Sequence, residues 1–190
     1  MKTLTEALES LLAAMDRLEI PYEVGGSVAS SAHGIPRTTM DVDLVVDMAP
    51  DKIGQFVNEV RDEFYADATQ MREAFTAGRA TNLIHLTGGW KFDLFPLRAD
   101  EYSQAEFARR AFREIQPNSG ARIECSVSSM EDTLLRKLEW FRAGGEISER
   151  QWSDVVGMWN AGGSRADMEY LRHWAKRLGL DDLLEKLTGS

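Results

Sequence analysis

The chain has 190 residues, a formal charge of −9 and 43% hydrophobic residues, which suffices for one sizeable core or for a core domain with a helical appendage. The acidic balance excludes a general nucleic-acid binder, because phosphates are repelled unless a local basic patch attracts them. The single cysteine, Cys125, excludes an internal disulfide, and no apolar run is long enough to cross a bilayer, so we expect a cytoplasmic protein with no membrane partner.

The first part of the chain reads as a helix followed by strand, helix and strand. Hydrophobic spacing predicts a helix over residues 3–19 and a short strand at 22–24. The glycine pair Gly25 and Gly26 then leads into a second, short helix. Residues 41–47 (DVDLVVD) alternate between polar and apolar side chains, which is typical of a strand with one buried face.

The middle of the chain alternates between helical and extended patterns. In order, we expect helices at 53–60 and 68–77, two strands around a Thr-Gly-Gly turn within 82–97, and a last strand at 122–127. Ser103 and Glu106 form a capping-box pattern, which predicts one helix continuing through AEFARRAFREI at residues 105–115.

After residue 127 the composition becomes helical throughout. Helices are expected at about 130–143, 149–161 and 164–178, and after Asp181. We therefore predict an α/β core domain at 1–127 and a helical domain at 128–190 that packs against it. Trp140, Trp152 and Trp159 are expected to pack these helices together, and stacking of one of them on a nucleotide base is the alternative.

Three aspartates carry the candidate chemistry. Asp41 and Asp43 point the same way from one strand, with Cα atoms roughly 7 Å apart. Asp93 lies on the polar face of a later strand, and if that strand is a neighbour, all three carboxylates converge. Such a group repels itself unless a cation lies between its members, and Mg²⁺ prefers oxygen ligands of this kind. The alternative is a solvated strand face.

The small residues before the second helix suit phosphate binding. Gly25, Gly26 and Ser27 would expose backbone N–H groups and a hydroxyl, and Arg37 could reach a triphosphate. A glycine pair alone marks only a turn, so the ordered combination with the acids is what favours a nucleotide site.

Together these residues resemble the nucleotidyltransferase superfamily, which has the DNA polymerase β-like fold. Its pattern is Gly-Gly/Ser, a gap of about nine to thirteen residues and Asp-x-Asp, with a third acid on a later strand. Gly26-Ser27, Asp41-Val42-Asp43 and Phe92-Asp93-Leu94 match it over residues 20–97. The resemblance implies an α/β (α+β) fold with a mixed sheet flanked by helices, followed by a C-terminal helical bundle.

A looser similarity connects the helical part to small prokaryotic AbiEii-type toxins and related minimal nucleotidyltransferases. There a helix carries a lysine and the next helix an aspartate, which Lys137 and Asp154 match. The alternatives are a solvated lysine and an ion pair of Asp154 with Arg150 on the same helix.

The resemblance implies Mg²⁺-dependent transfer of a nucleoside monophosphate from an NTP, ATP among them, to a hydroxyl group. Asp41, Asp43 and Asp93 would bind two Mg²⁺ ions; Gly25, Gly26, Ser27 and Arg37 would hold the phosphates; and Lys137 and Asp154 would complete the catalytic set. Relatives modify tRNA, proteins or small molecules such as aminoglycosides, in some cases within toxin–antitoxin or phage-defence pairs, so a cognate antitoxin is a further expected partner.

Two questions stay open from the sequence. The acceptor could be a tRNA if Arg109, Arg110 and Arg113 form a local basic patch, although a solvated helix face is favoured for them. A catalytically silent nucleotide-binding or partner-binding protein with the same fold is the alternative to an enzyme.

Overall fold

The computed structural model describes residues 2–33 and 38–189. Across these residues the strands form one mixed sheet in the order β3-β4-β5-β2-β1-β7-β6. The strands are β1 Tyr22–Val24, β2 Asp41–Val46, β3 Phe64–Tyr65, β4 Thr81–His85, β5 Lys91–Pro96, β6 Ala111–Ile115 and β7 Ile123–Val127. β2 is parallel to β5 and β1 is parallel to β7, whereas the other neighbours are antiparallel.

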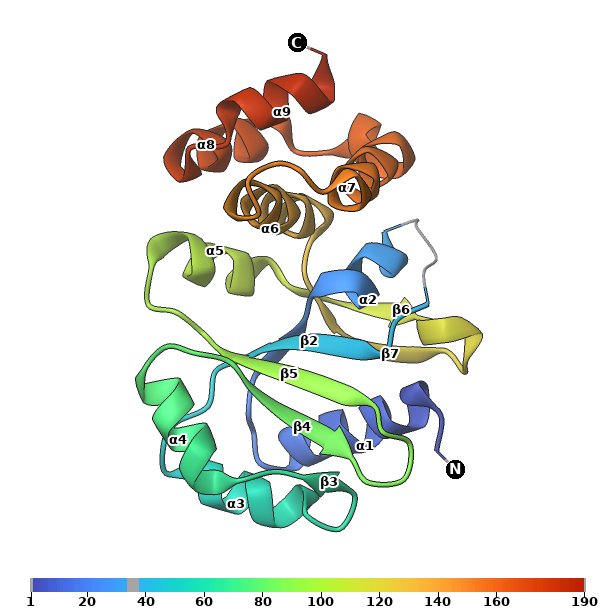
Figure 1. Cartoon of the computed structure of the whole chain (residues 1–190), viewed down its shortest axis with the longest axis vertical. Coiled ribbons are helices and arrows are strands. Elements are labelled where there is room, and N and C mark those ends of the chain that lie inside the picture. Colours follow the sequence, from blue (N-terminus) through green and yellow to red (C-terminus); the bar gives the residue numbers. More distant parts are fainter. Residues whose placement is uncertain (1, 34–37, 190) are drawn as a thin grey trace.

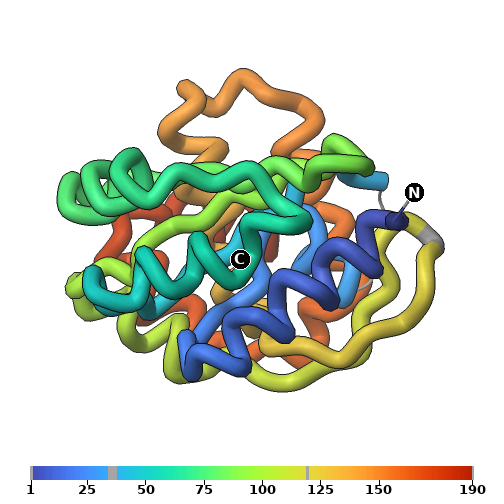
Figure 2. The backbone as a smooth tube through the Cα atoms, turned by 90° about the horizontal axis from the view of Figure 1, so that it is seen from below, coloured from blue at the N-terminus to red at the C-terminus, as the bar shows by residue number. Residues whose placement is uncertain are grey.

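Helices cover both faces of the sheet (Figure 1). The helices are α1 Leu4–Arg17, α2 Gly26–Ala32, α3 Lys52–Val60, α4 Ala68–Thr76, α5 Glu101–Arg109, α6 Met130–Ala143, α7 Glu149–Gly162, α8 Met168–Leu178 and α9 Asp181–Thr188. Figure 2 shows α1, α3 and α4 running across the lower face. On the upper face lie α2 and α5, with α6 to α9 beyond them, so the predicted mixed sheet and C-terminal helical bundle are confirmed.

Two hydrophobic clusters form the core. The first joins the sheet to the lower helices, with Leu8, Phe56 and Phe92 fully buried. The second joins α6 to α9 and takes in Tyr102 from α5. The domain boundary at residue 127 stays a prediction. No helix among the described residues is long and apolar enough to cross a membrane.

The predicted helix through residues 105–115 is wrong. α5 ends at Arg109, and Ala111–Ile115 forms β6, which pairs antiparallel with β7. Asp100, and not Ser103, accepts the capping hydrogen bond of α5. The local pattern is compatible with a helix, but ladder hydrogen bonds to the following strand, β7, decide the conformation.

This correction also removes the proposed basic helix face. Arg109 forms ion pairs with Glu131 and Asp132, and the guanidinium of Arg110 lies 3.9 Å from the centre of the Phe107 ring. Arg113 lies on β6. The three arginines therefore do not share one helical surface.

The expectation for the tryptophans is correct for two of three. Trp152 packs on Phe141, with ring centres 5.3 Å apart, and Trp159 packs against the second cluster. Trp140 is 62% exposed and lines a cleft instead of packing the helices.

Candidate active site

The parallel pairing of β2 and β5 brings the acids of two sequence segments together. Asp43 lies beside Asp93 in register, and Asp41 lies beside Lys91. Since residues i and i+2 of a strand point to the same face, all four side chains lie on one face of the sheet. The expectation that the strand of Asp93 neighbours that of Asp41 and Asp43 is confirmed.

Asp43 lies in an excess of negative charge. Burial and the charges of Asp93 and Asp41 raise the pKa of Asp43 to about 6, against the opposite effect of Lys91 and Lys137. A carboxyl group with this balance is stabilised in its ionised form by any additional cation.

Lys91 is a site residue that the sequence reasoning did not single out. Its Nζ lies 2.7 Å from Oδ2 of Asp93. The hydrogen bond that Lys91 donates to the Asp93 carboxylate raises the pKa of Lys91, and the charges of Asp93, Asp41 and Asp43 contribute in the same direction. Strand alternation placed Lys91 on the face of Asp93, and this signal could have identified it.

The glycine pair closes tightly on Asp43. The N–H of Gly25 donates to the main-chain oxygen of Asp43 at 2.9 Å. Gly26 has φ +57°, and a Cβ atom there would lie 1.8 Å from Oδ2 of Asp43. Only glycine therefore fits at position 26 without moving the carboxylate.

Lys137 and Asp154 face the sheet from the helical part. They lie on α6 and α7, and Nζ of Lys137 is 3.4 Å from Oδ2 of Asp154. Both side chains are largely buried, at 17% and 19% exposure. The two residues that the looser resemblance singled out are thus neighbours, and the charge of Lys137 reaches Asp43.

A cleft of about 910 Å³ separates the sheet from α6 and α7. Its lining includes Asp43, Lys137 and Asp154, together with the segment 25–27 and Trp140. Asp41 and Asp93 are not part of the lining that the described residues provide. Arg37, the predicted triphosphate ligand, lies outside the described residues.

Carboxylate oxygens are ligands that suit Mg²⁺, so the residue types fit the metal. Within residues 2–33 and 38–189, however, no three acidic, histidine or cysteine side chains are arranged to hold a metal ion. Asp41 is exposed, and Asp93 is engaged by Lys91. Binding by all three acids requires Lys91 to leave Asp93, and two Mg²⁺ ions stay a prediction.

Comparisons with known proteins identify the fold. Neither protein-family models nor curated proteins gave a match. The solved structure of the antibiotic-resistance factor ANT(2'')-Ia is 17% identical, with a TM-score of 0.54, over 97% of this chain and 96% of that one. Its crystal structure in complex with adenylyl-2''-tobramycin has the same identity and TM-score, over 91% of this chain and 98% of that one.

A third similar structure is an antigenic nucleotidyltransferase-like protein from Paracoccidioides brasiliensis. It is 19% identical, with a TM-score of 0.50, over 80% of this chain and 74% of that one. These similarities show that the chain has the nucleotidyltransferase fold. The narrower resemblance to AbiEii-type toxins stays a prediction.

Proposed function

We propose that the protein is a metal-dependent nucleotidyltransferase that transfers a nucleoside monophosphate from an NTP to a hydroxyl group of a small molecule. The observation that carries the proposal is the register of Asp43 beside Asp93, with Gly26 closed on the Asp43 carboxylate. Two carboxylates at neighbouring positions of one sheet face, one of them (Asp43) lining the cleft, suit phosphoryl-type chemistry.

In the proposed reaction, the acceptor oxygen forms a bond to the α-phosphorus, and the bond from that phosphorus to the β-phosphate oxygen breaks. Pyrophosphate leaves with the electron pair, and Asp93 accepts the hydroxyl proton. Asp41, Asp43 and Asp93 would hold Mg²⁺, which when bound supplies charge stabilisation to the reacting phosphate. Gly26 and Ser27 would bind phosphate oxygens, and Lys137 would neutralise negative charge across the cleft.

Three observations favour a small acceptor over tRNA. The chain carries a formal charge of −9, and the three arginines near residue 110 do not share one helical surface. ANT(2'')-Ia, which shares the fold, was solved with adenylyl-2''-tobramycin. Trp140, exposed at the cleft, offers a flat aromatic surface for the nucleobase or for the acceptor. The toxin–antitoxin and phage-defence context, and any antitoxin partner, rest on the sequence resemblance alone.

One observation favours the silent alternative. The ammonium group of Lys91 already neutralises Asp93, as a bound metal would. A protein that binds nucleotide without turnover could keep this arrangement permanently, so activity has to be measured directly.

The test is incubation with each α-labelled NTP and Mg²⁺ against separate pools of small molecules, tRNA and protein. We expect label on a small molecule, release of pyrophosphate, and a loss of at least about 100-fold in Asp43→Asn. Asp47→Asn is the matched control, because Asp47 is exposed just past the end of the same strand. Label on tRNA or protein would refute the small acceptor, and no transfer with any pool would favour the silent alternative.

A further inference from the structure

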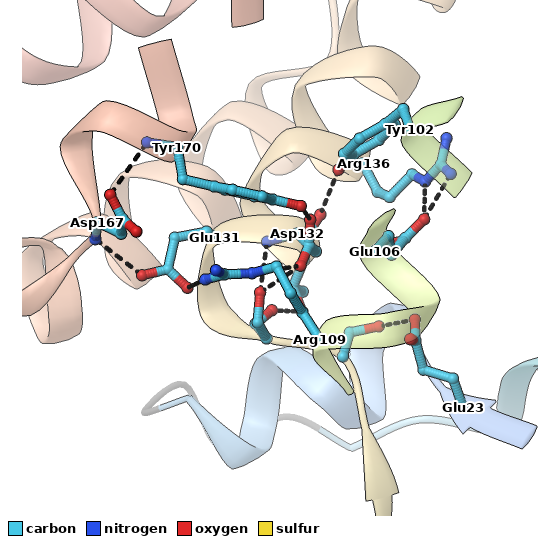
Figure 3. Close-up of polar contacts among 12 residues, drawn as sticks. Glu23, Tyr102, Glu106, Arg109, Glu131, Asp132, Arg136, Asp167 and Tyr170 are labelled. Atoms are coloured by element: carbon cyan, nitrogen blue, oxygen red, sulfur yellow. Dashed lines mark hydrogen bonds and ion pairs between the residues drawn. The ribbon is translucent and has the colours of Figure 1, made fainter. Parts of the chain in front are cut away.

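The cleft is also lined by a second group of polar side chains, and Figure 3 shows Glu23, Glu106 and Arg136 of this group. Glu23 of β1 lies there with Ser128, which follows β7, and with Glu106 of α5 and Arg136 of α6. We call these four residues the inner subsite. No step of the proposed transfer uses them.

The two acids whose charges act on Glu23, Glu106 and Asp132, each have an arginine and a further polar partner nearby. Glu106 accepts hydrogen bonds from Arg136, which also donates to Ser103 at 2.9 Å. Asp132, close by, accepts from the hydroxyl of Tyr170 at 2.6 Å and lies 3.5 Å from Nε of Arg109. Both acids are therefore compensated by an arginine.

Glu23 is the exception. It is only 1% exposed, and its Oε1 accepts a hydrogen bond from Ser128. Its Oε2 is buried with no hydrogen-bond partner, and no arginine or lysine of the described residues forms an ion pair with Glu23. Buried polar atoms without a partner are rare and costly, which makes a ligand the natural explanation.

The surroundings of Glu23 are negative. Burial, together with the charges of Glu106 and Asp132, raises the pKa of Glu23 to about 8, against the opposite effect of Ser128 and Arg110. An anionic ligand group would be repelled here. A cation would be attracted, and its N–H groups could donate to the unpartnered oxygen.

We propose that the inner subsite binds a protonated amine of the acceptor molecule through Oε2 of Glu23. The inference rests on the proposed function, since the ligand is the acceptor of the transfer reaction. Glu23 pairs with Val45, two residues from Asp43 on the same face, so the Cα atoms of Glu23 and Asp43 lie roughly 8 Å apart. A small molecule with an amine at one end and a hydroxyl at the other can span this separation within the cleft.

Binding of an ammonium group also favours the ionised form of Glu23. At pH 7, below the raised pKa, the side chain holds a proton when the cleft contains no cation. The bound amine therefore displaces a proton from Glu23 into the buffer, with Glu106 and Arg136 keeping their mutual ion pair.

The experiment is calorimetric titration at pH 7 in two buffers of different ionisation enthalpy. The probes are glucosamine, spermidine and tobramycin. N-acetylglucosamine and fully N-acetylated tobramycin are the control ligands, because they lack the charged amines. The proteins are the wild type, Glu23→Gln and the control Glu124→Gln, whose residue is exposed on β7. We expect at least one amine to bind to the wild type with release of a proton. The same amine should bind at least tenfold more weakly to Glu23→Gln, and without proton release.

Several results would overturn the inference. None of the amines binds, an acetylated control ligand binds as tightly as the corresponding amine, or the affinity of Glu23→Gln for the amine stays within twofold of that of the wild type. Equal weakening in Glu124→Gln would show general attraction to an acidic protein and would also overturn it. Thermal melting of Glu23→Gln checks the fold, which the uncharged isostere should keep.

The proposed function fails separately. A wild type that binds an amine through Glu23, yet transfers no nucleotide to it from any NTP, would refute the transfer reaction and leave the binding site intact. Conversely, transfer to an acceptor with the same KM in the wild type and in Glu23→Gln would refute the subsite alone.

Discussion

Gly26→Ala tests whether the position of the Asp43 carboxylate matters. The new Cβ atom would lie 1.8 Å from Oδ2 and 2.7 Å from Cγ of Asp43. Ordinary contact begins at 3.4 Å, so the carboxylate or the turn must move by about 1.6 Å, the difference between 3.4 and 1.8. A misplacement of about 1 Å at a reacting centre costs on the order of 100-fold in rate, and we expect at least that loss in kcat/KM.

The variant also loses stability for a reason unrelated to catalysis. Gly26 has φ +57°, where an alanine costs roughly 1–2 kcal/mol in the free energy of unfolding. Gly89→Ala is the matched control, because Gly89 has φ +67° in the turn between β4 and β5 and a Cβ there meets nothing within 4 Å. Urea denaturation and initial-rate kinetics measured on both variants separate the two effects.

The expected pattern is a loss of stability in both variants, larger in Gly26→Ala because of the added clash, and a loss of activity in Gly26→Ala alone. If Gly26→Ala transfers nucleotide at the wild-type rate, Asp43 does not act from the observed position. If Gly89→Ala loses as much activity, the effect comes from general destabilisation and the reasoning about the carboxylate fails.

Two further predictions concern the charges on this sheet face. Lys91→Met removes the partly exposed ion pair with Asp93, which is worth up to about 1 kcal/mol. The variant should therefore bind Mg²⁺ up to about fivefold more tightly than the wild type, as measured by calorimetry. Weaker binding of Mg²⁺ would instead mean that Lys91 orders the site. The pKa of Glu23 is raised from 4.5 to about 8, so between these values the native state holds a proton that the unfolded chain has lost. Stability should fall as pH rises through this window, by at most about 1.4 kcal/mol per unit from Glu23. Urea denaturation from pH 5 to 8 should give a shallower fall for Glu23→Gln, and an unchanged slope would contradict the raised pKa.

Much of the site could be predicted because strand periodicity is a local property. The alternation in residues 41–47 fixed which side chains share a face, and the apolar neighbours of Asp93 indicated an interior strand. The glycine pair between a strand and a helix indicated a close approach, and Gly26 indeed lies against Asp43.

The sequence-based predictions were wrong where contacts between different segments of the chain decide the structure. Residues 111–115 carry a pattern compatible with a helix, and only pairing with β7 makes them a strand. Trp140 lies on the same helix as buried residues, and its exposure depends on the cleft between α6 and the sheet. The spacing of residues in the sequence defines which side chains share one face of a helix or strand. The element that packs against this face is decided by the tertiary structure.

Glu23 illustrates this limit most sharply. In the sequence it is the middle residue of a three-residue strand, where an acid would normally point to solvent. In the sheet, β1 is an interior strand between β2 and β7, and helices cover both faces of the sheet, so the carboxyl group is buried. The sign that Glu23 is buried is its position in an interior strand. That position can be recognised only when the strand order is known.

The strand order also shows that Glu23, Asp43 and Asp93 lie on three adjacent strands, β1, β2 and β5, and on one face of the sheet. Only Asp93 has a lysine beside it in the same strand, and the pKa values of the other two acids are raised. A fold selected for stability alone would place apolar side chains at such positions, since buried acids without partners destabilise the native state. Two such groups in the lining of a single cleft are more simply explained by ligands that supply the missing positive charge: a metal ion at Asp43 and an amine at Glu23.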